Sequence, residues 1–287
     1  MREKFDHAFA TAERFTGKNV SLPVLGSVLF HARDGAITVA ATNLEYAVEV
    51  SLSGSGEGEE KICVPARVLN AFVQSLGDEK IEGEIKNKHL LLKGGTRTTK
   101  INCISAEEFP LIPSLKKHTG AVVSSHALKD GIEKVLPAVS LSGFKPELNG
   151  ILFTIGKQSL ILAATDTFRL AEKTIPVAQM RADKNFSFIL PARVASEIMR
   201  ILGSGEDVEV WIDENQALFN AGNIRVVSRL IDGVFPEYRA IVPKNFEATS
   251  IMQKNEIKDS IRASGIFSSK LQDVTLGFHE SHIEVFS

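Results

Sequence analysis

Cysteine is scarce in this chain of 287 residues. The two cysteines, Cys63 and Cys103, both lie in apolar segments typical of strands. Two cysteines are too few for a disulfide framework or for a zinc site built on thiolates. Their small number favours a reducing compartment, and we therefore expect a cytoplasmic protein.

An excess of positive charge is also missing. The sequence has 33 Lys and Arg residues against 35 Asp and Glu residues, and its formal net charge is -2. This balance excludes a protein that holds nucleic acid through bulk positive charge. Any contact with a polyanion has to come from a localised basic surface.

Long hydrophobic runs are absent as well. The longest uncharged stretch, residues 19–32, contains Pro23 and is shorter than the ~20 residues that a membrane-spanning helix needs. The N-terminal residues carry charges with no apolar signal core behind them. We therefore expect neither export nor membrane insertion.

The motifs of common catalytic and cofactor sites do not occur. None of the seven histidines belongs to an H-E-x-x-H motif, and there is no G-x-x-x-x-G-K-[ST] phosphate loop. His279 and His282 are expected to face opposite sides of a strand, because side chains alternate along it. We predict no metal site, no cofactor and no enzymatic activity, with an unrecognised hydrolase as the least favoured alternative.

An internal repeat organises what is present. Residues 37–43 (ITVAATN) return at 160–166 (LILAATD), an offset of 123. Residues 64–68 (VPARV) return at 190–194 (LPARV), and the Phe-Pro pair of 109–110 returns at 235–236, both at an offset of 126. Three matches in one order at nearly one spacing indicate a duplicated domain.

A third copy begins near the C-terminus, since residues 256–261 (EIKDSI) resemble 127–132 (ALKDGI). The strand-like segment at 120–124 has no counterpart before Phe5. We therefore expect domains at 1–117, 118–247 and 248–287, the first without an N-terminal strand and the third incomplete. Extension of the period gives a parent protein of roughly 370 residues.

Each copy combines helical and strand-like patterns. The sequence predicts helices at 3–16, 66–77, 126–139, 192–203 and 255–264. The segments 66–77 and 192–203 also have Pro at the start and Gly at the end, as expected of helix ends. Alternating segments joined by Asp-Gly turns predict antiparallel strands between them. Two helices on an antiparallel sheet in each repeat make the fold class α+β.

Several segments carry a family resemblance. They are residues 146–153 (PELNGILF), 164–171 (ATDTFRLA), 230–238 (LIDGVFPEY), 21–26 (SLPVLG) and 64–67 (VPAR). Together with the repeat, they resemble the bacterial DNA polymerase III β subunit, the sliding clamp, over essentially the whole chain. The resemblance implies a tandem array of DNA-clamp domains, ring-forming, in which a head-to-tail homodimer of three-domain protomers encircles duplex DNA.

The same resemblance implies the partners and the working surfaces. The ring is a processivity factor without chemistry that tethers the replicative polymerase. It docks the polymerase III catalytic subunit, the clamp loader and other replication and repair proteins through short linear peptides. Helices line the hole, where the expected DNA contacts are Arg67, Arg193, Arg200, Lys258 and Arg262, and Lys18 lies in a loop that in this family can approach DNA. Solvated helix faces are the alternative for these residues.

The peptide pocket and the ring interface are mapped by the same resemblance. The pocket maps onto Leu148, Thr165, Thr167, Phe168, Arg169, Leu170, Pro236, Ile241 and Leu271. Here the Thr167-Phe168 pair replaces the Gly-His pair of several relatives, and an ordinary turn after a strand is the alternative. The interface maps onto Thr99 and Ile101 facing Ile266 and Phe267, for which ordinary core is the alternative. A repeat-built peptide-binding module that does not encircle DNA is the alternative function.

Overall fold

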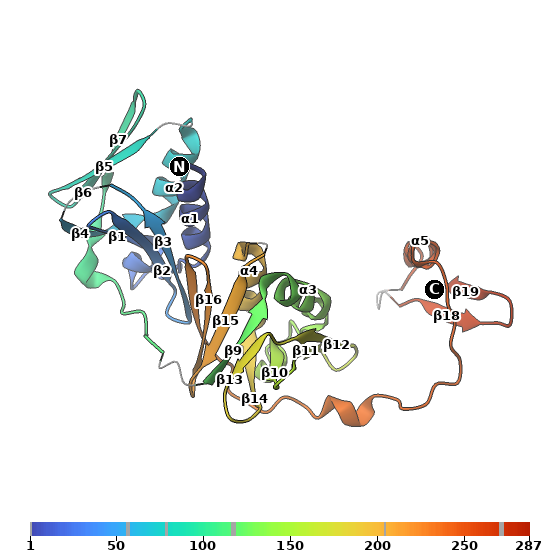
Figure 1. Cartoon of the computed structure of the whole chain (residues 1–287). Helices are drawn as coiled ribbons and strands as arrows, with labels where there is room; N and C mark the ends of the chain where they lie inside the picture. The colour runs from blue at the N-terminus through green and yellow to red at the C-terminus, as the bar shows by residue number, and fades with distance from the viewer. Residues whose placement is uncertain (1, 56–57, 78–79, 116–118, 204, 270–272) are drawn as a thin grey trace. The chain divides into compact units, whose positions relative to one another are not determined.

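The structure is a computed structural model in which residues 2–55, 58–77, 80–115, 119–203, 205–269 and 273–287 are described. The chain forms two compact units, Met1–Phe235 and Pro236–Ser287. The first unit contains two copies of the repeat, and the second contains the start of another (Figure 1).

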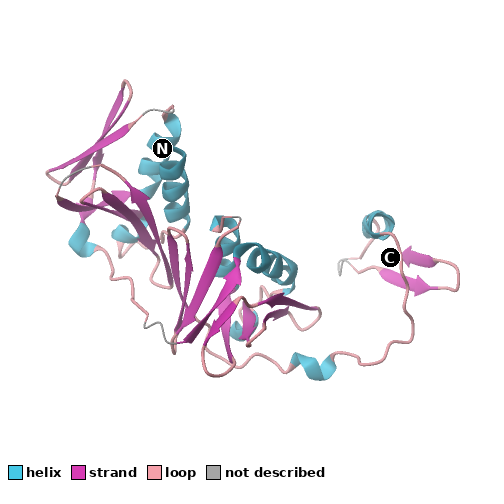
Figure 2. Cartoon of the chain, in the orientation of Figure 1, coloured by secondary structure: helices cyan, strands magenta, loops and turns pink. Residues whose placement is uncertain are grey.

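The first copy has helices on one side of antiparallel strands (Figure 2). Its helices are α1 (Arg2–Arg14) and α2 (Ala66–Ser75). Its strands are β1 (Ser27–Arg33), β2 (Ala36–Thr42), β3 (Tyr46–Ser53), β4 (Glu59–Pro65), β5 (Ile81–Lys86), β6 (His89–Gly94), β7 (Arg97–Asn102) and β8 (Ile104–Ser105).

The second copy repeats this order up to β7, with one additional strand before its first helix and another, β13, before the counterpart of β4. Its helices are α3 (Ser125–Val135) and α4 (Ala192–Ile201). Its strands are β9 (Thr119–Ser124), β10 (Gly150–Ile155), β11 (Ser159–Thr165), β12 (Leu170–Pro176), β13 (Gln179–Arg181), β14 (Phe186–Pro191), β15 (Asp207–Ile212), β16 (Gln216–Ala221) and β17 (Ile224–Arg229).

Local sequence explains the ends of these helices. In α4, Val194, Ala195, Ile198 and Ile201 are buried at helical spacing, and Pro191 precedes the first turn. Helix α3 ends earlier than the predicted 126–139. A 3-10 turn that contains Pro137 follows it, because proline lacks the N–H that continues an α-helix.

One antiparallel sheet runs through both copies. Its strand order is β13-β9-β15-β16-β17-β3-β2-β1-β4-β8. The two copies meet where β17 pairs with β3, and Val226 lies opposite Val48 at the centre of that pairing. Smaller sheets have the orders β12-β11-β10-β14 and β5-β6-β7. The junction between copies is therefore made of backbone pairing.

Side chains reinforce this junction on both faces. Arg225 of β17 forms an ion pair with Glu49 of β3, and its Nη2 donates to the carbonyl oxygen of Pro113 at 3.1 Å. Arg14 of α1 lies 3.8 Å from Glu197 of α4. The two copies are thus linked by charge on the helix side as well as through the sheet.

The core of the first unit lies between the helices and the strands. In the second copy, Phe153 is fully buried and stacks on Phe188 with ring centroids 5.0 Å apart. Phe219 meets the same ring edge-on at 6.3 Å. Trp211 is 6% exposed.

The second unit contains α5 (Lys254–Gly265), β18 (Thr275–Phe278) and β19 (Ile283–Phe286). The prediction that His279 and His282 face opposite sides was wrong, because their rings stack with centroids 4.6 Å apart. Both residues lie in the turn that joins the two strands, where the chain reverses and strand alternation does not apply.

The thiol of Cys63 is expected to be inert in the folded protein. Burial raises its pKa to about 12, and the side chain is 0% exposed. Because only the thiolate reacts, N-ethylmaleimide at about pH 8 should leave Cys63 unmodified until denaturant is added. Mass spectrometry of tryptic peptides measures this, and modification of native Cys63 at the rate of a free thiol would contradict it.

Candidate functional site

The helices carry more positive charge than the rest of the chain. The five α-helices together contain eleven Lys or Arg residues and eight Asp or Glu residues. The remaining residues of the sequence therefore contain 22 basic and 27 acidic residues. A polyanion would accordingly be attracted to the helices more than to the rest of the surface.

The six basic residues predicted to contact DNA are all exposed. Within the described part of the chain, no ion pair engages Lys18, Arg67 or Lys258, so their charges are available to a ligand. Arg200 lies 3.6 Å from Glu197, and Arg262 lies 3.7 Å from Asp259.

Arg193 also lies over an aromatic ring of the first copy, a contact that the sequence did not indicate. Its guanidinium carbon lies 5.7 Å from the ring centroid of Tyr46, which belongs to the first copy. Burial raises the pKa of Tyr46, and the positive charge of Arg193 opposes that rise. Arg193 therefore contributes to the junction between the copies. Its sequence counterpart, Arg67, has no such contact among the described residues.

The sequence analysis missed Arg14 and Arg225, which also hold the junction. Arg14 lies in the last turn of α1, where a basic residue interacts favourably with the helix dipole. Its position in the sequence therefore did not indicate a contact with the second copy. Arg225 and Glu49 are neighbours only because β17 pairs with β3. Such a register between distant segments cannot be read from residue spacing.

The loop after β11 is held by side-chain caps. The Thr165 Oγ1 donates to the Arg169 carbonyl oxygen at 2.8 Å and accepts from the Thr167 N–H at 3.1 Å. The Asp166 Oδ1 accepts from the N–H groups of Phe168 and Arg169, and its Oδ2 accepts from the Arg169 Nε at 2.8 Å. These hydrogen bonds, led by the Arg169 N–H, lower the pKa of Asp166.

The same loop geometry occurs after β2 in the first copy. There Thr42 and Asn43 make the equivalent bonds, with the Asn43 Oδ1 accepting from the N–H groups of Glu45 and Tyr46. In both loops the third residue is left-handed, with φ of 78° at Leu44 and 79° at Thr167. The bonding pattern is thus that of a turn after a strand, as the alternative interpretation stated, and it also fixes which side chains the loop exposes.

The loop of the second copy exposes an aromatic side chain. Phe168 is 98% exposed in the second copy. Of the other pocket residues in this unit, Leu148 and Thr165 are buried, Leu170 is half-buried, and Thr167 and Arg169 are exposed. The burial of Leu148 limits any contribution from its side chain. Leu141 and Phe144, 99% and 96% exposed, are apolar surface residues that the sequence analysis missed.

The remaining pocket residues are not in this unit. Pro236 and Ile241 belong to the second unit and are exposed there. Leu271 lies outside the described residues. The first unit alone therefore offers the capped loop and Phe168 as the predicted peptide-contacting surface.

Thr167→Gly is expected to stabilise the protein by about 0.5–1 kcal/mol. A β-branched residue in the left-handed region costs roughly 1–2 kcal/mol, of which the greater chain entropy of glycine cancels about half. Urea unfolding measures the change. Thr167→Ala keeps a Cβ and should give no such gain; an equal gain from alanine would show that backbone strain is not the cause.

The predicted ring-interface residues lie in one strand, β7, and after one helix, α5, and they differ in exposure. Thr99 is half-buried in β7, whereas Ile101 is buried inside the first copy, opposite Leu90. The side chain of Ile101 therefore packs within the first copy, and the predicted interface role of Ile101 remains a prediction about its strand. Ile266 and Phe267, which follow α5, are 78% and 81% exposed.

Two of the open strand edges in the described part of the first unit correspond to the edges that join the copies. Among the described residues, β7 pairs only with β6, and β12 pairs only with β11. By position in the repeat, β7 is the counterpart of β17 and β12 is the counterpart of β3. The pairing that joins the copies thus uses the β3 edge of the first copy and the β17 edge of the second. The first copy keeps the β7 edge, which corresponds to β17, and the second copy keeps the β12 edge, which corresponds to β3.

Within the described residues, no helix has both the length and the apolar character needed to cross a membrane.

Comparison with known proteins gives consistent matches. Residues 1–113 match the sequence family described as "DNA polymerase III beta subunit, N-terminal domain", and residues 122–237 match "DNA polymerase III beta subunit, central domain". The chain is similar to the "Beta sliding clamp" of Bacillus subtilis, with 26% identity over 256 residues, 85% of this chain and 67% of that protein. The protein of the same name from Staphylococcus epidermidis is 26% identical over 79% of this chain and 62% of that protein.

A solved structure gives the same picture of the fold. The sliding clamp of Pseudomonas aeruginosa bound to griselimycin superposes with a TM-score of 0.93 at 22% identity, covering 99% of this chain and 78% of that chain. The chain spans about two thirds of the length of the curated relatives it matches.

Proposed function

Since the chain belongs to the DNA polymerase III beta subunit family, the bacterial sliding clamps, we propose that it acts as a processivity factor in the cytoplasm. It forms part of a ring around duplex DNA, assembled as a homodimer in the complete protein. Clamps of this family are not enzymes, so the protein holds other enzymes on DNA and performs no reaction itself.

The junction between β3 and β17 is the observation that carries this proposal. It joins two copies head to tail, through different edges of the same repeat. A head-to-tail contact continues until the array closes into a ring or grows into a filament. The open edges of β7 and β12 allow the same pairing to continue in both directions. Thr99 lies on the β7 edge, in keeping with a role there in ring closure.

The helices, together with the loop after α1 that holds Lys18, supply the contact with DNA in this proposal. Lys18, Arg67 and Lys258 are exposed and free of ion pairs among the described residues. A closed ring needs only modest phosphate contacts, because its topology rather than its affinity prevents dissociation. A protein of net charge -2 can then remain on DNA. Arg193, Arg200 and Arg262 add to this surface where their intramolecular contacts permit.

The capped loop 165–169 supplies part of the peptide site. Phe168 presents an exposed aromatic side chain beside Arg169, whose guanidinium is paired with Asp166, and this surface suits a linear peptide with apolar residues. Leu170 is the next residue along the chain, and Pro236, Ile241 and Leu271 are further proposed peptide contacts on the family resemblance alone. The polymerase III catalytic subunit, the clamp loader and other replication and repair proteins are the proposed partners.

Retention on circular DNA tests the ring. The complete protein, with a full third repeat, should stay on nicked circular plasmid after loading and should be lost when a restriction enzyme linearises the same plasmid. Gel filtration separates bound from free protein, and sedimentation gives the mass of the assembly. Equal retention on circular and linear DNA would favour the alternative, a peptide-binding module that does not encircle DNA.

A further inference from the structure

The segment that connects the two copies, residues 109–115 (FPLIPSL), follows the 3-10 turn η2 (Ala106–Glu108) and runs toward the second copy (Figure 1). All seven residues are described, and none belongs to a helix or a strand. Phe109 is 9% exposed, Leu115 is 8% exposed and Ile112 is half-buried, whereas Leu111 is 97% exposed. The buried side chains of this segment therefore recur at every third residue.

The prolines of the segment account for this spacing. Pro110 and Pro113 each fix their own φ at about −65° and restrict the preceding residue, Phe109 or Ile112, to extended conformations. Phe109 has φ of −75° and ψ of 130°, close to polyproline II. A polyproline II helix has three residues per turn, so residues 109, 112 and 115 share one face. The segment is largely preorganised and loses little chain entropy when that face is buried.

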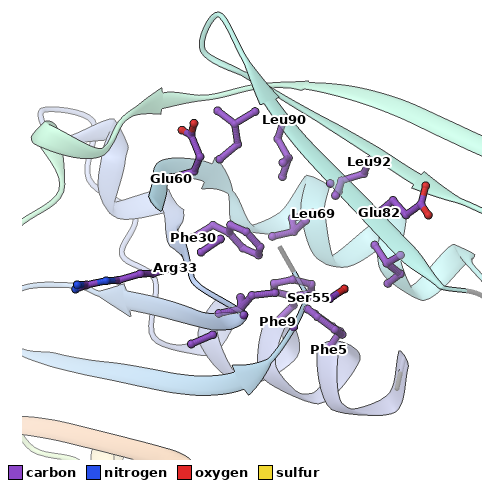
Figure 3. Close-up of a pocket in the computed structure, with 18 of the residues that line it drawn as sticks. Phe5, Phe9, Phe30, Arg33, Ser55, Glu60, Leu69, Glu82, Leu90 and Leu92 are labelled. Carbon is purple, nitrogen blue, oxygen red and sulfur yellow. The ribbon is translucent and has the colours of Figure 1, made fainter. Parts of the chain in front are cut away.

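The segment packs on the face of the sheet opposite the helices. On the helix side of β1, Phe30 lines a cavity of about 430 Å³ together with Phe5, Phe9 and Leu69 of the helices (Figure 3). The neighbouring residue Leu29 faces the other way, because side chains alternate along a strand. Leu29 packs against a separate cluster, whose buried members are Val24, Ala40, Cys63 and Phe109. The first end of the segment is thereby anchored to the first copy.

The other end of the segment is anchored to the second copy. Leu115 is buried in a cluster with one side chain from each of β15, β16 and β17, which are Trp211, Leu218 and Val227. Val226 belongs to the core on the helix side, so its neighbour Val227 lies on the opposite face of the sheet. Ile112 packs against both clusters. Three apolar side chains of the segment thus tie the two copies together along one face.

A backbone group of the segment is also bound to the junction itself. The carbonyl oxygen of Pro113 accepts a hydrogen bond at 3.1 Å from Nη2 of Arg225. The guanidinium of Arg225 also pairs with Glu49, which lies directly opposite in the pairing of β17 with β3. The side chain of Arg225 therefore joins β3, β17 and the connecting segment at one point.

We propose that residues 109–115 act as a clasp that locks the β3–β17 junction, so that the junction opens only when Ile112 and Leu115 leave the sheet. Docking of the clasp and pairing of the strands require the same placement of the two copies, and the two are therefore coupled. Such coupling is reciprocal, so a change that weakens the clasp also weakens the strand pairing. The clasp makes the connection between the copies a rigid joint in place of a flexible linker.

Hydrogen exchange followed by mass spectrometry tests the clasp, because amide exchange reports the population of locally opened states. Leu115→Asp places a charge in the apolar cluster and should accelerate exchange in peptides from β3 and β17 about tenfold or more. Leu111→Asp introduces the same side chain at a position that is 97% exposed and should change these rates less than about twofold. Exchange in β10, which belongs to the separate four-stranded sheet, should rise less than exchange at the junction.

A second pair of variants leaves the buried face of the clasp intact. The Pro113 side chain is exposed, so Pro113→Ala keeps the apolar anchors and the carbonyl oxygen and removes only preorganisation. Junction exchange should then rise about two- to fivefold, and Ser114→Ala, at the next exposed position, should leave it unchanged. This pair decides the matter if Leu115→Asp does not fold. Equal junction rates within either pair, or equal acceleration of β10 and the junction, overturns the proposal.

Discussion

Phe153→Ala is expected to lower the free energy of unfolding by about 3–5 kcal/mol, the usual cost of deleting a fully buried aromatic ring. The ring is 0% exposed and lies between Phe188, on which it stacks, and Phe219, which meets it edge-on. Truncation removes both aromatic contacts and leaves a cavity that the surrounding strands cannot fill.

Urea unfolding followed by fluorescence measures this loss. Trp211 is the single tryptophan of the chain and is buried in the same copy as Phe153, so its emission reports on that copy. Phe168→Ala is the matched control, because Phe168 is 98% exposed and its ring contributes little to folding. A loss below about 1 kcal/mol for Phe153→Ala would mean that the core repacks around the cavity.

Val226→Pro is expected to uncouple the two copies and to cost about 3 kcal/mol or more. Val226 lies in β17 between Phe219 of β16 and Val48 of β3, in the interior of the ten-stranded sheet. Proline there removes an N–H donor, which sheets tolerate only at edges and bulges. With the ladder broken, each copy should unfold in its own transition.

Val226→Ala is the control for the lost side chain. It keeps the N–H and should cost about 2 kcal/mol through lost burial while leaving one cooperative transition. Limited proteolysis adds an independent readout, since cleavage between residues 110 and 115 should accelerate only in the proline variant. A single transition and unchanged proteolysis for Val226→Pro would show that the side-chain contacts alone hold the copies together.

Much of the fold follows from the sequence because the repeat and the helix-end residues are local signals. The segments 64–68 and 190–194 predict the starts of α2 and α4, and both helices begin where they indicate. The α+β class and the family resemblance were confirmed by the fold and by the matching sequence families.

What the sequence did not predict depends on contacts between distant segments. The pairing of β3 with β17 joins residues 176 positions apart at Arg225 and Glu49, and no periodicity records it. The burial of Ile101 follows from its position opposite Leu90 in a sheet whose register was unknown. The roles assigned to the DNA-contacting and peptide-contacting residues remain predictions.

The left-handed loop residues show a second limit of prediction from sequence. Leu44 and Thr167 adopt positive φ although neither is glycine, so the usual signal of such a turn is absent. The loop is determined by the Thr and Asx side chains that precede these residues, through hydrogen bonds that become recognisable once the strand ends are known.

The covalent connection between β8 and β9 has a consequence for how such a ring opens. The two copies joined by β3 and β17 belong to one polypeptide, so each edge experiences its partner at an effective concentration on the order of millimolar for a short connection. An equivalent junction between two chains has no such tether, and its occupancy falls as the protein is diluted. The same backbone pairing is therefore permanent within a chain and reversible between chains, and a ring built from these repeats will open at the joints that no peptide bond spans.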